Sequence, residues 1–129
     1  MQTQKPLGCL ADMAWKKAYQ HDYNSRAWRA TRRYVRSRDD GLCFRCAHFG
    51  LAAHGAEVDH FVPVSKGGTD SPSNSWLLCM SCHREKTQRE AQGLAGFRGK
   101  LNPDTGWPMP EPDWLSLIAN KNAESENNL

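Results

Sequence analysis

The feature that most constrains this chain is a pair of C-x-x-C motifs, Cys43–Cys46 and Cys79–Cys82, with 32 residues between them. Two such motifs supply the four soft ligands of a tetrahedral structural zinc. The chain has 129 residues, of which only 39% are hydrophobic, so its core is thin and a metal can reinforce it. Redox-active thiols or an unrelated role are the alternatives. Cys9 lies outside both motifs and is interpreted as an ordinary small residue.

The chain begins with the polar residues MQTQK, which do not resemble a secretory signal, and it contains no apolar run long enough to span a bilayer. We therefore expect a cytoplasmic protein without a membrane partner. In a reducing compartment, four paired cysteines favour a metal over disulfides.

Charge is unevenly distributed along the chain. The net charge is +3, but residues 1–50 carry +6 and residues 51–129 carry −3. Ser25 is a good N-cap, and a helix is predicted from Arg26 to about Arg38. One side of this helix is apolar, and the opposite side carries four arginines, Arg26, Arg29, Arg33 and Arg36. This face is predicted to contact nucleic-acid phosphates, and the alternative is an ordinary solvated surface.

The chain divides into three predicted parts. Residues 1–24 form an N-terminal extension, in which apolar spacing favours a short helix over residues 10–18. Residues 25–97 form the main domain, with strand-forming residues from Glu57 to Val64, a Gly- and Ser-rich loop, and a helix from Cys82 to Gln92. Residues 98–129 contain several glycines and prolines and are expected to form an irregular tail, frayed over its last ten residues.

Residues that carry chemistry concentrate between Asp59 and His83. Asp59 and His60 lie together in the predicted strand, Asn74 follows the loop, and His83 lies on the predicted helix. If strand and helix pack together, Asp59 and His83 can bind one divalent ion and leave positions open for water and phosphate oxygens. His60 points away from Asp59 along a strand, which leaves it free to act as a general base.

The segments EVDHFVPVSKGG and NSWLLCMSCHREKT resemble the HNH nuclease family, in particular its small phage and prophage enzymes with a four-cysteine zinc site. The resemblance covers residues 43–89, with the catalytic and zinc elements in the family's order. It implies a small α+β fold of the ββα-metal (His-Me finger) type, with flanking helices and a structural Zn²⁺. By position, it assigns that zinc to Cys43, Cys46, Cys79 and Cys82.

The same resemblance implies roles for the four residues of the motif. Asp59 and His83 become ligands of a catalytic Mg²⁺ or other divalent ion such as Mn²⁺ or Ni²⁺. His60 becomes the base that activates water, and Asn74 holds the loop and orients His60 through its amide. The implied activity is endonucleolytic hydrolysis of DNA, leaving 5′-phosphate and 3′-hydroxyl ends.

The implied setting is a phage or prophage enzyme in the cytoplasm of a bacterial host. A link to genome packaging, with terminase or other packaging proteins as partners, follows from the resemblance alone, and a monomer is expected. Further phosphate contacts are expected from the predicted metal-binding helix, at Arg84, Lys86 and Arg89. His21, His48 and His54 are interpreted as ordinary histidines.

Two other function classes explain these residues less well than an enzyme does. A catalytically silent, zinc-stabilised module that only binds nucleic acid has no use for the intact set of Asp59, His60, Asn74 and His83. A zinc-dependent protein-interaction module leaves the arginine face unexplained. The sequence therefore favours the nuclease.

Overall fold

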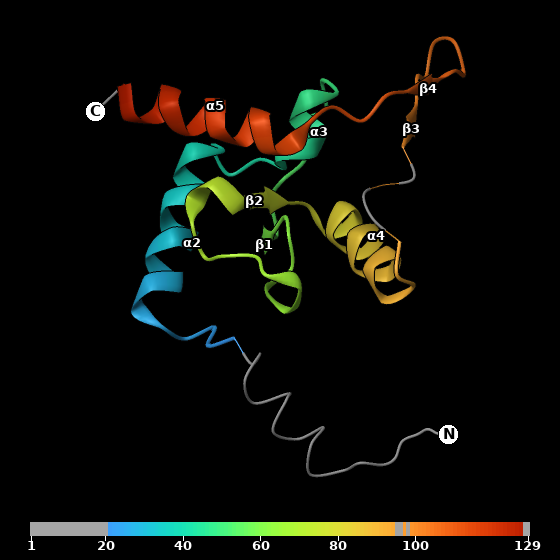
Figure 1. Ribbon diagram of the computed structural model, residues 1–129. Helices are drawn as coiled ribbons and strands as arrows, with labels where there is room; N and C mark the ends of the chain where they lie inside the picture. Colours follow the sequence, from blue (N-terminus) through green and yellow to red (C-terminus); the bar gives the residue numbers. More distant parts are fainter. Residues whose placement is uncertain (1–20, 95–96, 98, 128–129) are drawn as a thin grey trace, which may run out of the picture.

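The structure is a computed structural model that describes residues 21–94, 97 and 99–127 (Figure 1). The helix expected over residues 10–18, and Cys9, lie outside the described residues. The chain folds as a small mixture of helices and short strands. None of the described helices is long and apolar enough to cross a lipid bilayer.

Helix α2 (Arg26–Arg38) begins and ends where the sequence predicted. The Ser25 hydroxyl accepts a hydrogen bond from the Trp28 amide, which caps the first turn. The apolar side is buried through Trp28, Thr31 and Val35. The helix ends at Asp39, and a tight turn leads the chain into the first cysteine motif.

The centre of the fold is an antiparallel pair of strands, β1 (Glu57–His60) and β2 (Ser75–Leu78), followed by helix α4 (Met80–Ala91). This is the expected ββα arrangement, and Figure 1 shows the strands between α2 and α4. All of β2 is buried, with its side chains alternating between two cores. Leu77 packs with Val58 against α2, whereas Trp76 packs with the cysteines. The same alternation sends Asp59 and His60 to opposite sides of β1.

The segment between the strands differs from the prediction. Strand character was expected from Glu57 to Val64, but β1 ends at His60. Pro63 cannot donate to a strand ladder, and a 3-10 turn η1 (Val64–Lys66) follows it. A second 3-10 turn, η2 (Pro72–Asn74), leads into β2.

A buried arginine connects several elements at the end of α2. Arg38 is 4% exposed, and its Nε and Nη2 donate to the carboxylate of the adjacent Asp39 at 2.7 and 3.0 Å. Its other N–H groups donate to the carbonyl oxygens of Pro72 and Ser75 and to Asn122 Oδ1, at 2.8–2.9 Å. One guanidinium thus joins α2, η2, β2 and the C-terminal helix, and every donor it has is used.

The prediction of an irregular tail over residues 98–129 is wrong. Strands β3 (Lys100–Leu101) and β4 (Pro108–Met109) form a hairpin, and helix α5 (Trp114–Asn127) follows it. Helix α5 contacts α2 and η2, and it lies across them and beside helix α3 (Phe44–His48) in Figure 1. Trp114 and Ile118 are buried in the same core as the cysteines, so tertiary packing stabilises a polar sequence as a helix.

This packing predicts unequal effects of two substitutions on α5. Ile118 is fully buried and Leu115 is 40% exposed. We expect Ile118→Ala to lower the free energy of unfolding by about 2–5 kcal/mol, and Leu115→Ala to change it by about 0.5 kcal/mol. Chemical denaturation of the zinc-loaded protein measures both. Equal, small effects would show that α5 does not belong to the core.

Candidate active site and metal centres

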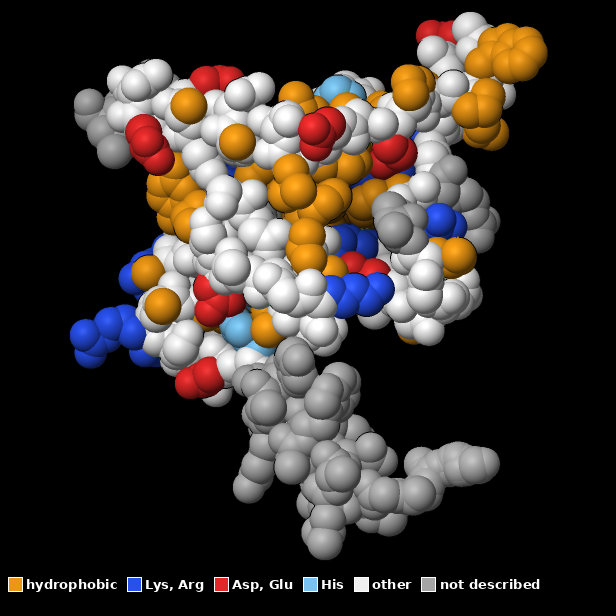
Figure 2. All heavy atoms as spheres, viewed as in Figure 1, with side chains coloured by type: hydrophobic (Ala, Val, Ile, Leu, Met, Phe, Trp, Pro, Cys, Tyr) orange, Lys and Arg blue, Asp and Glu red, His pale blue; other side chains and the backbone are white. Residues whose placement is uncertain are grey.

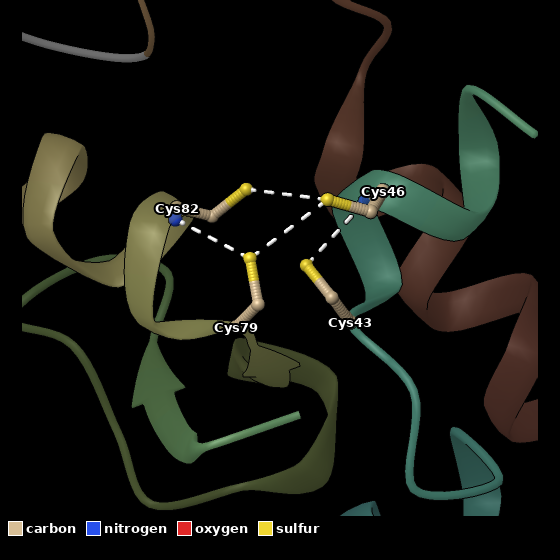
Figure 3. A group of neighbouring side chains, drawn as sticks. All are labelled: Cys43, Cys46, Cys79 and Cys82. Atoms are coloured by element: carbon tan, nitrogen blue, oxygen red, sulfur yellow. Dashed lines mark hydrogen bonds between the residues drawn. The ribbon is translucent and has the colours of Figure 1, made fainter. Parts of the chain in front are cut away.

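The four cysteines of the two C-x-x-C motifs converge in one buried cluster (Figure 3). Cys43 is the N-cap of α3 and Cys79 is the N-cap of α4, and each thiol accepts the amide N–H of the second cysteine in its motif. Each motif therefore has two roles. Its first cysteine caps the helix, and its spacing brings both sulfurs to the same side of the helix start. The cluster joins α3 to α4 across the core.

The geometry of this cluster fits a zinc ion. The Sγ atoms all lie within 4.8 Å of one another, and Cys46 Sγ is 3.8 Å from Cys79 Sγ and 3.7 Å from Cys82 Sγ. Four sulfurs about 2.3 Å from a central zinc would be about 3.8 Å apart. A shell of four thiols leaves no open position, which is typical of a structural site.

Packing the thiols together makes their charges interdependent. Interaction with the Cys82 thiol lowers the pKa of Cys43 to about 4, whereas burial raises the pKa of Cys46 to about 11. Several thiolates cannot share this buried space without a cation, and a divalent ion that displaces the protons supplies the missing charge.

Arg45, the third residue of the first motif, is the cluster's charged neighbour. It is 1% exposed, and its Nη1 lies 3.4 Å from Cys82 Sγ. Its Nε and Nη2 donate to the two carboxylate oxygens of Glu111 at 3.1 Å, and its guanidinium stacks 3.8 Å from the Phe97 ring. Four thiolates around Zn²⁺ leave two negative charges, so a buried arginine beside them is stabilising.

Asp59 and His83 meet on the α4 side of the strands, as predicted. Asp59 Oδ1 lies 3.7 Å from His83 Nε2. The other carboxylate oxygen, Oδ2, accepts from Lys86 Nζ at 2.8 Å and from Trp76 Nε1 at 3.4 Å. Oδ1 is thereby left facing the imidazole, and both side chains are partly exposed, at 17% and 34%. A carboxylate oxygen and an imidazole nitrogen are a suitable donor set for Mg²⁺ or Mn²⁺.

The prediction that Lys86 contacts DNA does not agree with the structure. Lys86 is 5% exposed, and its Nζ donates to the His60 carbonyl at 2.9 Å and pairs with both Asp59 and Glu90. Lys86 does lie on the predicted helix, but its ammonium points towards Asp59 and not towards solvent. Arg84 is exposed on α4, and Arg89 is partly exposed.

His60 lies on the other side of β1, against α2. Its ring stacks on Trp28 with centroids 4.2 Å apart and planes 15° apart. Its Nε2 lies 2.8 Å from Asp70 Oδ1, and His21 Nε2 lies 2.5 Å from the same oxygen. Sequence reasoning missed Asp70 and interpreted His21 as ordinary. The ligand atoms of His21, His60 and Asp70 lie within 4.8 Å of one another.

Asn74 holds the loop but does not orient His60 in the way that was expected. Its Oδ1 accepts from the Val62 amide at 2.9 Å, and its Nδ2 donates to the carbonyls of Val62 and Thr69. The loop is tight here, because a Cβ on Gly68 would lie 1.8 Å from the Val62 carbonyl oxygen. The side chain that contacts the His60 ring nitrogen is instead Asp70.

The arginine face of α2 is exposed and forms a groove. Arg29, Arg32, Arg33 and Arg36 line a depression of about 300 Å³ with Glu57 at its edge. Arg32 was not in the predicted set. Arg26, which was predicted, is exposed at the start of the helix. In Figure 2 some Lys and Arg side chains project at the left edge of the molecule, where α2 lies in Figure 1. Arg36 also donates to the Ala56 carbonyl at 3.0 Å, which holds its side chain along the surface.

Comparison with known proteins gives consistent matches. The family model described as HNH endonuclease matches residues 43–89. A probable HNH endonuclease of Lactococcus phage SK1 is 42% identical over 77 residues, which are 55% of this chain and 80% of that protein. The type IV methyl-directed restriction enzyme EcoKMcrA of Escherichia coli (strain K12) is 35% identical over 75 residues, 54% of this chain and 25% of that enzyme.

A solved structure is also similar. The HNH endonuclease of the deep-sea thermophilic bacteriophage GVE2, crystallised with a manganese ion, matches with a TM-score of 0.59 and 26% identity. The match covers 67% of this chain and 98% of that protein.

The thiol cluster predicts how the chain depends on zinc. We expect one tightly bound zinc per chain, and Cys43→Ser or Cys82→Ser to unfold the domain, because structural zinc contributes about 10 kcal/mol or more to such folds. Metal analysis with circular dichroism measures both, and Cys9→Ser is the matched control. Folded, active protein without zinc would contradict the assignment.

Proposed function

The chain belongs to the HNH endonuclease family, and we propose that it hydrolyses DNA with one divalent ion on Asp59 and His83 and with His60 as general base. The observation that carries the proposal is the pairing of Asp59 and His83 at the end of β1, directly beside His60. The proposed metal ligand Asp59 and the proposed base His60 are thus neighbours at one strand end, where the phosphodiester would be bound.

Asp59 and His83 would hold the ion. Ligand atoms that share one ion, each about 2.1 Å from it, lie about 3–4 Å apart, and the 3.7 Å between Oδ1 and Nε2 fits this spacing. When bound, such an ion stabilises the negative charge that develops on the phosphoryl and leaving oxygens. Mg²⁺, Mn²⁺ and Ni²⁺ are the candidates, and the manganese in the GVE2 enzyme supports this class of ion.

Lys86 would act on the metal ligand instead of on DNA. By holding Oδ2, it fixes the carboxylate of Asp59 so that Oδ1 faces His83. A cation beside a metal site weakens metal binding by repulsion, but Glu90 pairs with the same ammonium and offsets its charge. Lys86 therefore orients the ligand at little electrostatic cost.

His60 would take the proton from the attacking water. As the water oxygen bonds to phosphorus, its proton moves to the imidazole, the bond to the 3′ oxygen breaks, and that oxygen gains a proton from solvent. The products are a 5′-phosphate and a 3′-hydroxyl. An imidazole base removes the need for a second metal ion to activate the water.

DNA would be bound by the arginine face of α2 and by Arg84 and Arg89 on α4. The groove lined by Arg29, Arg32, Arg33 and Arg36 offers guanidinium groups in an open depression of suitable charge for a phosphate backbone. Such contacts position the duplex without reading its sequence.

Similarity to two phage proteins supports a phage or prophage origin. We further propose that the protein acts in the cytoplasm of a bacterial host and that its role is linked to genome packaging, with terminase or other packaging proteins as partners. We propose that the protein acts as a monomer.

The competing proposal is a catalytically silent module that only binds nucleic acid. An assay of supercoiled plasmid nicking, with Mg²⁺, Mn²⁺ or Ni²⁺ and with EDTA as the control, distinguishes it from the nuclease. Binding without nicking in every ion would favour the silent module.

The arginine groove gives a prediction about salt dependence. In the His60→Ala background with EDTA, which suppresses cleavage during the measurement, Arg29→Ala/Arg33→Ala should weaken binding to all DNA sequences alike. The log–log slope of affinity against salt should fall by about 0.9 for each lost contact. Lys100→Ala/Lys121→Ala removes the same charge from the C-terminal segment and should leave the slope near that of the parent. Equal slopes for both doubles would make the groove an ordinary solvated surface.

We expect alanine substitutions of the two histidines to lower the cleavage rate for different reasons. His60→Ala should keep the ion and the fold but lose about 10²–10⁴ in rate, because the base is gone. His83→Ala should weaken ion binding, so added metal should restore part of its rate. Titration of Mn²⁺ against plasmid nicking measures both. Rescue of His60→Ala in place of His83→Ala would reverse the two assignments.

A further inference from the structure

The ring of His60 is held on two sides by residues that the proposed mechanism has not used. Trp28 lies flat against it, and Asp70 Oδ1 lies 2.8 Å from Nε2. The residue is 7% exposed. A buried imidazole with a stacked neighbour and one directional partner cannot rotate freely, so these contacts decide which ring nitrogen faces the reaction.

We propose that Asp70 is a positioning residue for His60, whose carboxylate accepts the Nε2–H and so leaves the lone pair on Nδ1 for the proton of the attacking water. The inference rests on the proposed role of His60 as the base. A neutral imidazole carries one N–H and one lone pair, so an acceptor at Nε2 fixes both. During the reaction Nδ1 gains the proton, and the carboxylate stabilises the imidazolium that forms.

Asp70 is itself firmly placed. Its backbone carbonyl accepts from Thr31 Oγ1 on α2 at 2.8 Å, and the neighbouring Thr69 carbonyl accepts from Asn74 Nδ2 at 2.9 Å. Burial opposes its charged form, but hydrogen bonds from His60 and His21 lower the pKa of Asp70 below its usual value. The acceptor is therefore an ionised carboxylate anchored to the helix that also supplies Trp28.

His21 strengthens this arrangement. Its Nε2 lies 2.5 Å from the same Asp70 oxygen, its ring packs edge-on against His60 at 4.9 Å, and its side chain is 9% exposed. Two imidazoles directed at one oxygen restrict the carboxylate to a single orientation. His21 precedes α2, so the segment entering the domain helps to position the loop.

The contact distances favour hydrogen bonds over a metal ion at these three residues. Ligand atoms around one first-row divalent ion are at least about 3 Å apart, whereas the contacts to Asp70 Oδ1 are 2.5 and 2.8 Å. The geometry is that of donors on a shared acceptor. The only described partner of the His60 ring nitrogen is accordingly the carboxylate.

The first test observes the hydrogen bond without any cleavage. In ¹H–¹⁵N spectra of the full-length, zinc-loaded protein with neutral imidazoles, the Nε2 proton of His60 should be visible and slow to exchange. Its signal is assigned by its loss in His60→Ala. It should disappear in Asp70→Ala and persist in Asp104→Ala, an exposed aspartate in the β3–β4 turn. Persistence in Asp70→Ala would overturn the inference.

The second test separates positioning from a structural role. Asp70→Ala should lower kcat about 100-fold, with KM, zinc content and the unfolding midpoint close to those of the Asp104→Ala control. Asp70→Asn, which keeps an acceptor oxygen, should recover part of the rate. A rate within threefold of wild type in both Asp70 variants would overturn the inference, as would rate losses that merely follow unfolding.

These outcomes distinguish the inference from the function on which it rests. Wild-type protein that shows the Nε2 proton but cleaves no DNA in any ion would overturn the proposed function and support the contact. Wild-type protein that cleaves DNA, with neither readout changed in Asp70→Ala, would overturn the inference alone.

Discussion

The cluster of four buried thiols brings together two parts of the chain that are far apart in sequence, and a metal ion bound there would cross-link them. The first motif begins α3 and the second begins α4, and the strands that carry the reactive residues run between them. A chain with so few apolar residues would gain stability from a metal ion bound by this cluster. Arg45 extends the cross-link, because the side chain that faces the sulfurs also binds Glu111 just before α5. The position of the C-terminal helix thus depends on the same cluster.

The β1–β2 strand pair determines on which side of the fold each candidate catalytic residue lies. Because successive side chains alternate, Asp59 faces α4 with His83 and Lys86, whereas His60 faces α2 with Trp28. The proposed metal ligands and the proposed base therefore lie on opposite faces of one strand end. In the proposed nuclease, the strand geometry keeps the contacts of Asp59 with His83 and Lys86 apart from the contact of His60 with Asp70.

Sequence reasoning succeeded where the signal is local or close in spacing. The cysteine motifs, the cap and faces of α2, and the alternation of Asp59 and His60 follow from periodicity and residue chemistry. It failed where a side chain's role depends on distant partners. The sequence pattern predicts that Lys86 is exposed on its helix, but ion pairs with Asp59 and Glu90 hold its side chain in the interior. Asp70 and His21 lie 49 residues apart and meet only in the fold, and α5 is a helix because Trp114 and Ile118 find a core.

The guanidinium of Arg38 has a consequence for how the chain opens and closes. All its donors are satisfied only when α2, η2, β2 and α5 are assembled together. A partly assembled chain would keep the pair with Asp39 but lose the bonds to Pro72, Ser75 and Asn122, and a hydrogen bond from a charged donor is worth about 1.5–3 kcal/mol. Intermediates are therefore disfavoured, and the loop between β1 and β2, tied through Pro72, has little freedom to open locally. We therefore expect that loop to open together with the rest of the fold, as one cooperative unit.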